Sequence, residues 1–537
     1  MDFINSLISL SNPFAPAAIL IFCIMVLMFF GLSSRKSLKY FAYIFSLISI
    51  LLSGVFILLG FLKSGVFSDN LFTSGISEVI QIIIIFIFMS VLITVLFIFA
   101  KNFESFIRIA MMYQAAVISI VFIIISKNFL AFFISLISFI SIIFILSSLL
   151  NSEKMIQESK ETSSLKIFKN SFLQELAVTR YFSVSLLFVI FLFFSFSLLY
   201  GISDFRNFQQ LMEGLSTGNF NVLFSFIIFA LSFYLYFGFF PFQAPYYNYS
   251  VKCSISSVYL IWLACFPVGI ISIFKFVPAA ALIFQSSANS AIYIFSAVIL
   301  VVMAGSAATL FKSKSLRKIS SSFITLIISA VMLSLLTYIC KIFSYQEFLW
   351  LNLANLSYLL ISFMPVVYLF TIFERKFTTA DPSYFKKIIL KNRFLSFSFT
   401  IYILSIFGIP GLQGFMVKID FIEVLINIFN GNYYNLSLPA VWILFALILI
   451  YIALAAAAAI RLLVLVFSNK SSGEAYKKDE KILSQFVPSR SIYILNGFCV
   501  ALIVVVGIIS LVEILFPGSF SSFFSIRSSE IFSNIVK

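Results

Sequence analysis

The chain has 537 residues, of which 62% are hydrophobic and 10% are charged, whereas soluble domains are usually about 45–50% apolar and about 25% charged. This composition excludes an ordinary soluble protein. The net charge of +15 is dispersed over many connections and not gathered on one domain face, so we expect anionic lipid headgroups, and no nucleic acid, as its counterpart.

Metal and redox chemistry are also disfavoured by the residues available. The chain contains no histidine, and its five cysteines show neither a CxxC pair nor any other zinc or iron–sulfur spacing. We therefore expect no metal and no cofactor in this chain.

Apolar runs recur along the whole chain and predict an all-α, polytopic membrane protein. A hydrocarbon core about 30 Å thick needs about 20 apolar residues per helix. A transmembrane strand would alternate apolar with polar residues, which these runs do not. We predict about fourteen membrane-spanning helices, at residues 14–32, 39–62, 80–100, 106–126, 128–150, 176–201, 221–240, 254–277, 290–311, 319–342, 347–373, 394–426, 440–468 and 491–515.

The distribution of basic residues supports this count. Of the 35 Lys and Arg residues, 25 lie in connections that leave odd-numbered helices and five in connections that leave even-numbered helices. Because short loops on the inner side of a membrane are enriched in Lys and Arg, the asymmetry predicts an even number of helices with both termini on the outer side.

Two of the predicted spans are interrupted by proline and glycine. Proline removes a backbone hydrogen bond and clashes with the preceding turn, so each site should break its helix and free backbone groups that need a polar or protein-lined environment. The seventh span runs into GFFPFQAPYY, with Gly238, Pro241 and Pro245, and the twelfth span contains GIPGLQG, with Gly408, Pro410, Gly411 and Gly414.

The two breaks fall at matching places in two groups of five helices, an arrangement typical of inverted-repeat transporters. We therefore predict two inverted five-helix repeats, each with a broken fourth helix, at residues 106–277 and 290–468. A three-helix segment, 1–105, precedes them, and a last helix with its tail, 469–537, follows. A pair of unrelated proline kinks is the alternative.

Lys418 is the best candidate for proton transfer, because it follows the second break within a predicted span. An ammonium group at the bilayer centre costs at least about 2.5–3.5 kcal/mol on insertion scales, so it is normally paired or faces water. A lysine can also release its proton, which suits a relay. Alternatively, Lys418 lies near a helix end and extends its amino group to the headgroups.

Three other charged residues are weaker candidates for proton transfer. Arg461 follows an alanine-rich surface that permits close helix packing, and it either faces the same polar axis or anchors the inner boundary. Glu175 opens the sixth span with Arg180 at a spacing that does not favour pairing on one helix face, so interfacial anchoring is favoured. Lys275, near the end of the eighth span, is interpreted as an outer-side anchor.

Five segments resemble, in order and spacing, those of subunit 2 (chain N) of the proton-pumping NADH:quinone oxidoreductase, respiratory complex I. This family is antiporter-like and related to Mrp-type cation/proton antiporters. The strongest match is SIFGIPGLQGFMVKIDF, similar to the family's twelfth-helix pattern. The segments are residues 405–421, 238–250 (GFFPFQAPYYNYS), 305–322 (GSAATLFKSKSLRKISSS), 196–205 (FSLLYGISDF) and 459–463 (AIRLL).

The chain departs from this family at most of the family's charged positions and would be a divergent member. The lysines of the family's seventh and eighth helices correspond to Tyr236 and Phe266. No acidic residue occurs between Lys127 and Glu153, where the family has its helix-five glutamate. Only Lys418 carries over, so the resemblance implies that the N-terminal half has lost the titratable path that the family uses for proton transfer.

The resemblance implies a membrane-arm subunit of complex I that contributes to proton translocation. NADH oxidation and ubiquinone reduction would take place in other subunits, and this chain would perform no redox catalysis. Its expected partners are neighbouring antiporter-like and small membrane chains of that complex, with anionic phospholipids such as cardiolipin at the basic inner loops.

The implied location is the mitochondrial inner membrane, with both termini on the intermembrane-space side, or alternatively a bacterial plasma membrane. Two other functions stay open. One is a structural scaffold subunit of the same complex with little or no proton transfer of its own. The other is a free-standing cation/proton antiporter.

Overall fold

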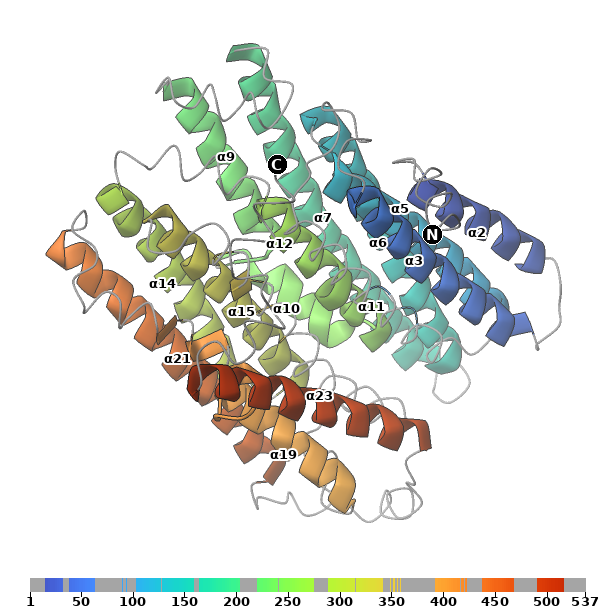
Figure 1. Ribbon diagram of the computed structural model, residues 1–537. Coiled ribbons are helices and arrows are strands. Elements are labelled where there is room, and N and C mark those ends of the chain that lie inside the picture. Colours follow the sequence, from blue (N-terminus) through green and yellow to red (C-terminus); the bar gives the residue numbers. More distant parts are fainter. Residues whose placement is uncertain are drawn as a thin grey trace. The chain divides into compact units, whose positions relative to one another are not determined.

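The computed structural model consists of helices joined by turns, and no β-strand occurs among the residues that it describes (Figure 1). Eight of the described helices are long and apolar enough to cross a membrane. The described residues are 15–31, 38–62, 89, 93, 103–126, 128–158, 164–202, 220–239, 241–274, 288–313, 315–340, 348, 351–352, 355, 358, 392–415, 417–419, 421–422, 437–467 and 490–515.

The prediction of an all-α, polytopic membrane protein is therefore confirmed. The number fourteen stays a prediction, because several predicted spans, including 80–100 and 347–373, lie largely outside the described residues.

Runs of β-branched and aromatic residues form helices here because a membrane offers the backbone no water. Each N–H and C=O group must find its partner inside the protein, and an α-helix provides these partners within the segment itself. Helix α5 (Phe103–Ile125) illustrates the point. Its second half, AVISIVFIII, is helical although Val, Ile and Phe favour strands in soluble proteins.

The first of two compact units, called the first unit below, comprises residues 1–291 and 335–349. Besides α5, its helices are α2 (Ala15–Gly31), α3 (Leu38–Leu62), α6 (Phe129–Glu158), α7 (Ser164–Ile202), α9 (Phe220–Tyr236), α10 (Gln243–Lys252), α11 (Ile255–Leu260), the π-helix η1 (Ile261–Cys265) and α12 (Phe266–Phe274). Helix α2 packs against α3 and α5, α5 packs against α6, and α7 packs against α6, α9 and α10 (Figure 1).

Buried polar side chains join helices within the first unit. The Gln114 side-chain amide on α5 donates to the carbonyl of Ser46 on α3 at 3.0 Å, and the Tyr113 hydroxyl donates to the carbonyl of Met89 at 2.6 Å. Buried polar groups are normally hydrogen-bonded, because an unpaired one is costly in an apolar interior. These bonds therefore fix how the helices are rotated about their axes.

The second unit comprises residues 292–334 and 350–537. Its helices are α14 (Ala288–Lys312), which begins just before the unit, α15 (Leu316–Ile339), which ends just after it, α19 (Arg393–Phe407), α21 (Leu438–Phe467) and α23 (Arg490–Leu515). Helix α19 packs against α21 and α23. The predicted domain limits at 105, 277, 290 and 468 stay predictions.

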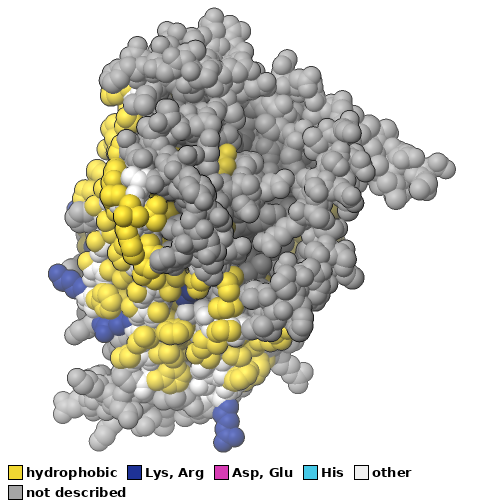
Figure 2. Space-filling view, turned by 60° about the vertical axis from the view of Figure 1, so that its left-hand side comes forward, with side chains coloured by type: hydrophobic (Ala, Val, Ile, Leu, Met, Phe, Trp, Pro, Cys, Tyr) yellow, Lys and Arg dark blue, Asp and Glu magenta, His cyan; other side chains and the backbone are white. Residues whose placement is uncertain are grey.

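Several helices carry exposed apolar side chains along one side. Phe29 of α2 and Leu438 of α21 are each 73% exposed. On the face drawn in Figure 2, the described side chains are mainly hydrophobic and the coloured charges are Lys and Arg. Large apolar surfaces mark contacts with lipid or with other membrane chains, as membrane-spanning helices require.

Candidate functional site

The second interrupted helix begins as α19 and stops at Gly408. Gly408 has a φ of +88°, a left-handed conformation that glycine adopts without steric cost. Its N–H donates to two carbonyls in the last turn of α19, each at 3.0 Å. Pro410 follows, and the chain is helical again at residues 413–415 and 417–419. The interruption thus gives α19 an abrupt C-terminal end.

Lys418 lies against this end of α19 and is only 6% exposed. Its amino group donates to the carbonyl of Ile406 at 3.0 Å and to the carbonyl of Phe407. The last carbonyls of a helix have no partner within the helix, and they form the negative end of its dipole. The lysine therefore occupies the position where the broken helix most favours a cation.

Two glycines provide the space that the Lys418 side chain fills. A Cβ on Gly408 would lie 2.6 Å from Cδ and 2.8 Å from Nζ of Lys418. A Cβ on Gly414 would overlap the carbonyl oxygen of Ser405, so this glycine lets the returning segment lie directly against α19. The Gly414 N–H donates to the Ser405 hydroxyl at 3.2 Å.

Lys418 has no ion-pair partner among the described residues. Asp420 and Glu423, the acidic residues that follow it in the sequence, lie outside them. The described partners of the Lys418 amino group are the backbone carbonyls of Ile406 and Phe407. The sequence placed Lys418 after the break but left open whether it is buried or extends to the headgroups, and it did not show that the preceding half-helix would supply its acceptors.

Helix α23 covers the same interruption. A Cβ on Gly507 would overlap the backbone of Gly411 and Leu412, so α23 touches the turn through a glycine. The Tyr402 hydroxyl of α19 donates to Oδ1 of Asn496 on α23 at 2.8 Å. These contacts hold α23, the last predicted span, against the break. The sequence did not predict this packing.

A row of neutral polar residues on the predicted eleventh span approaches the break. The Ser334 hydroxyl of α15 donates to Oδ1 of Asn352 at 3.0 Å, and Asn355 is fully buried one turn further on. Tyr358 follows after another turn, and its ring lies 3.0 Å from where a Cβ on Gly414 would be. The spacing Asn, Asn, Tyr at every third residue was the available signal.

The first interrupted helix, α9, ends at Tyr236, and α10 begins at Gln243. In the interval, Gly238 has a φ of +61° and its N–H donates to the carbonyl of Leu235 at 3.0 Å. Pro241 is exposed in the turn, and Pro245 lies in the first turn of α10, where its missing N–H removes no helical bond.

Tyr236 and Phe266, which correspond to lysines in the family that the sequence resembles, are neutral aromatic residues. The Tyr236 hydroxyl donates to the carbonyl of Cys265, the last residue of η1, at 2.8 Å. The ring of Phe266 stacks on Phe237, with centroids 6.0 Å apart. The rings of Tyr236, the last residue of α9, and Phe237, which follows it, fit against α12 because Gly269 has no side chain. A Cβ there would lie 2.5 Å from Cε1 of Tyr236 and 2.8 Å from Cζ of Phe237.

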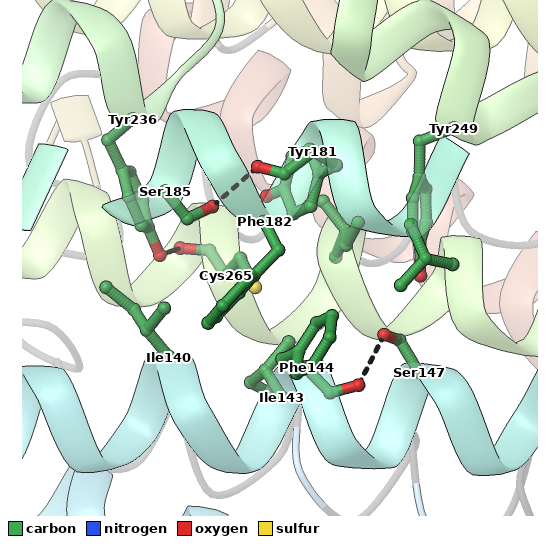
Figure 3. Close-up of a pocket in the computed structure, with 12 residues that line it drawn as sticks. Ile140, Ile143, Phe144, Ser147, Tyr181, Phe182, Ser185, Tyr236, Tyr249 and Cys265 are labelled. Carbon is green, nitrogen blue, oxygen red and sulfur yellow. Dashed lines mark hydrogen bonds between the residues drawn. The ribbon is translucent and has the colours of Figure 1, made fainter. Parts of the chain in front are cut away.

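A small cavity lies beside Tyr236, between α6, α7, α9, α10 and η1 (Figure 3). Its volume is about 20 Å³, counted as the space that the centre of a water-sized sphere can occupy. Its polar lining consists of Ser147, Tyr181, Ser185, Tyr236, Tyr249 and Cys265. Sequence reasoning missed this cavity, because its walls come from segments more than 100 residues apart.

The remaining predicted charged residues provide none of the described contacts of Lys418. Glu175 and Arg180 are exposed on α7, in the first unit. Arg461 is half-buried on α21, and its guanidinium donates to the carbonyl of Phe311, near the C-terminal end of α14, at 3.4 Å. Lys275 lies outside the described residues. Among described contacts, none joins Arg461 to Lys418.

No protein-family model matches the chain, and no curated protein matches its sequence. Solved structures do share its fold. A chain of the Mrp complex from Dietzia sp. DQ12-45-1b aligns with a TM-score of 0.66 and 12% identity, covering 97% of this chain and 99% of that chain.

Two respiratory assemblies contain similar chains. One is the membrane-bound sulfane sulfur reductase, an archaeal respiratory membrane complex, with a TM-score of 0.65, 14% identity, and 95% of this chain and 94% of that chain covered. The other is respiratory complex I from Thermus thermophilus, with a TM-score of 0.56, 14% identity, and 94% and 98% covered. At such identities the likeness establishes a common fold along nearly the whole chain.

Proposed function

We propose that this chain is an antiporter-like, proton-translocating subunit of a multi-subunit membrane complex, and that Lys418 takes up and releases the proton. The observation that carries the proposal is the burial of Lys418 at the end of a broken helix, with two backbone carbonyls as acceptors. A buried ionisable residue inside a membrane protein marks an ion or proton path by default.

The geometry of the amino group suits proton exchange. An ammonium group has three N–H donors, and two of them are directed at Ile406 and Phe407. The neutral amine keeps two N–H bonds, so both carbonyls can stay bonded after the proton leaves. The third hydrogen is the one available to water, and its transfer leaves the lysine in place.

The finer proposal is a membrane-arm subunit of an NADH:quinone oxidoreductase, with redox catalysis in other subunits and no cofactor in this chain. Five sequence segments support it, together with the fold shared with a chain of complex I from Thermus thermophilus. Its partners would be other antiporter-like and small membrane chains, and its membrane either the mitochondrial inner membrane or a bacterial plasma membrane.

A scaffold role is the second candidate, and one observation favours it. The amino group of Lys418 satisfies carbonyls that the break would otherwise leave without a partner, which is a structural task. In addition, the cavity beside Tyr236 has only neutral polar groups in its described lining. A scaffold would keep these contacts and move no proton.

Proton counting in the natively purified complex, reconstituted into vesicles, separates these functions. With Lys418→Met, we expect proton translocation per NADH oxidised to fall, while Lys312→Met, an exposed lysine at the end of α14, should leave it unchanged. Unchanged proton stoichiometry in an assembled Lys418→Met complex would favour the scaffold. Recovery of the chain alone, with sodium/proton exchange in vesicles, would favour a free-standing antiporter.

A further inference from the structure

We propose that the cavity beside Tyr236 is a hydration site, in which ordered water joins neutral side chains into a chain that leads along α6 to Asn151. The cavity offers about 20 Å³ to the centre of a water-sized sphere, and one water needs about 10–15 Å³ measured in this way. A buried water also needs two to four polar partners, which the hydroxyls of Tyr181, Tyr249 and Ser147 can supply (Figure 3).

The lining chemistry selects water over other ligands. Among the described lining residues, every polar group is a hydroxyl, a thiol or a backbone atom, and none is charged. A cation would lack a carboxylate, an anion would lack a basic group, and desolvating either ion is costly. An organic molecule does not fit into space for about one water.

Around the cavity, side-chain hydroxyls already bond to backbone carbonyls. The Tyr236 hydroxyl donates to the carbonyl of Cys265 at 2.8 Å, and the Ser185 hydroxyl donates to the carbonyl of Tyr181 at 3.1 Å. The Tyr249 hydroxyl donates to the carbonyl of Ser257 on α11 at 3.4 Å. Two clusters of hydroxyls therefore face a common space, and a water between Tyr181 and Tyr249 would connect them.

From Ser257 the chain of polar contacts continues to the far end of α6. The Ser257 hydroxyl donates to Oδ1 of Asn151 at 3.2 Å, and the N–H of Ser254 donates to the same oxygen at 2.6 Å. Asn151 follows Ser147 by one turn, so both project from the same face of α6. The contacts thus run along α6 from the cavity to Asn151.

Two buried amide atoms at this end give independent support for water. Nδ2 of Asn151, a donor, and Oε1 of Gln174 on α7, an acceptor, have no hydrogen-bond partner among the described residues. Asn151 is 3% and Gln174 is 5% exposed. The two amides bind neighbouring residues of the chain. Oδ1 of Asn151 accepts from the N–H of Ser254, and the backbone carbonyl of Gln174 accepts from the thiol of Cys253 at 3.9 Å. A second water there would satisfy both amides.

Hydrogen–deuterium exchange of the Cys265 thiol tests this site directly. The probe is the full-length chain in lipid nanodiscs, with Cys23, Cys253, Cys340 and Cys499 replaced by Ala, transferred into D₂O. The S–H stretching band in the infrared should convert to S–D at least about tenfold faster than that of a matched variant retaining only Cys23, since dry buried groups exchange only through local opening. Cys23 is fully buried on α2 and does not line the cavity.

A further variant distinguishes a water chain from loose packing. Asn151→Leu in the Cys265-only background should slow the thiol exchange if water enters past Asn151. Faster exchange would mean that the substitution merely loosened the unit, and it would count against the proposal. Equal rates for Cys265 and Cys23 would overturn it.

A density map of the unmodified chain provides a measurement that does not depend on any variant. Water density within hydrogen-bond distance of the Tyr181 and Tyr249 hydroxyls would support the site. An empty cavity in a map that resolves other buried waters would overturn it. Neither measurement depends on whether Lys418 transports protons.

Discussion

The amino group of Lys418 donates to the carbonyl of Ile406 at 3.0 Å, so the lysine that follows the break bonds to the half-helix that precedes it. A returning segment therefore supplies the cation that the end of α19 favours. Because Lys418 joins the two halves of one interrupted span and fills the space beside Gly408, changes to the surrounding glycines should act on Lys418.

Replacing Gly408 with alanine should disturb Lys418 in two separable ways. The left-handed conformation of Gly408, with φ +88°, should cost a side chain about 1–2 kcal/mol, and the new Cβ would lie 2.6 Å from Cδ of Lys418. We expect a lower midpoint of thermal unfolding and reduced proton translocation per NADH oxidised in the purified complex.

Gly411→Ala is the matched control for this change. Gly411 has a similar φ of +85°, but a Cβ there meets no atom within 4 Å. It should lower the unfolding midpoint and leave proton translocation largely intact. Equal losses of translocation in both variants would show that Lys418 does not need the space at Gly408.

The contact between α23 and the break predicts a difference between two glycines on one helix. Gly507→Ala should destabilise the chain because its Cβ would overlap the backbone of Gly411, and overpacking typically costs about 1–3 kcal/mol. Gly497→Ala should be neutral or stabilising, since its Cβ would meet Phe394 at 3.7 Å and alanine favours a helix by about 1 kcal/mol.

Thermal unfolding of the two glycine variants, followed by circular dichroism in the same detergent, checks the predicted order. An equal midpoint for Gly507→Ala and Gly497→Ala would contradict the packing of α23 on the break.

The hydrogen bond between α19 and α23 predicts a smaller effect. Tyr402→Phe removes the O–H that donates to Asn496 at 2.8 Å, and a buried neutral hydrogen bond contributes about 0.5–1.5 kcal/mol. The unfolding midpoint should fall modestly, whereas Tyr293→Phe, at a 45% exposed position on α14, should not change it. A Tyr402→Phe protein as stable as the unmodified chain would show that this bond contributes nothing net.

The sequence was sufficient for the helical architecture and for the position of both interruptions, because hydropathy and proline act locally along the chain. It also placed Lys418 beside the second interruption. What it could not provide were the partners of these residues. The acceptors of Lys418 lie 12 and 11 residues before it, and Arg461 donates to Phe311, 150 residues earlier.

The cavity beside Tyr236 was equally inaccessible from local patterns. Its tyrosines and serines read as ordinary members of apolar spans, and the π-helix that presents Cys265 to Tyr236 leaves no distinct mark in the sequence IWLAC. Close approaches such as that of Gly269 to Tyr236 depend on how two distant helices pack. These features therefore follow from the three-dimensional packing and not from the local sequence.

The approach of α12 to α9 at Gly269 yields a prediction about coupled residues. In Gly269→Ala, the Cβ would lie 2.5 Å from Cε1 of Tyr236 and 2.8 Å from Cζ of Phe237, so we expect a loss of about 1–3 kcal/mol in the free energy of unfolding. Phe237→Leu alone should also destabilise, since it shortens a side chain that is 1% exposed.

Combining the two changes distinguishes steric overlap from a general loss of packing. If the methyl group introduced by Gly269→Ala meets the ring of Phe237, the smaller leucine relieves the overlap, and the double variant should be more stable than the sum of the single effects predicts. Unfolding midpoints of the four proteins in one detergent give the coupling. Strict additivity would mean that the helices shift apart, in which case the bond from Tyr236 to the carbonyl of Cys265 would be lost as well.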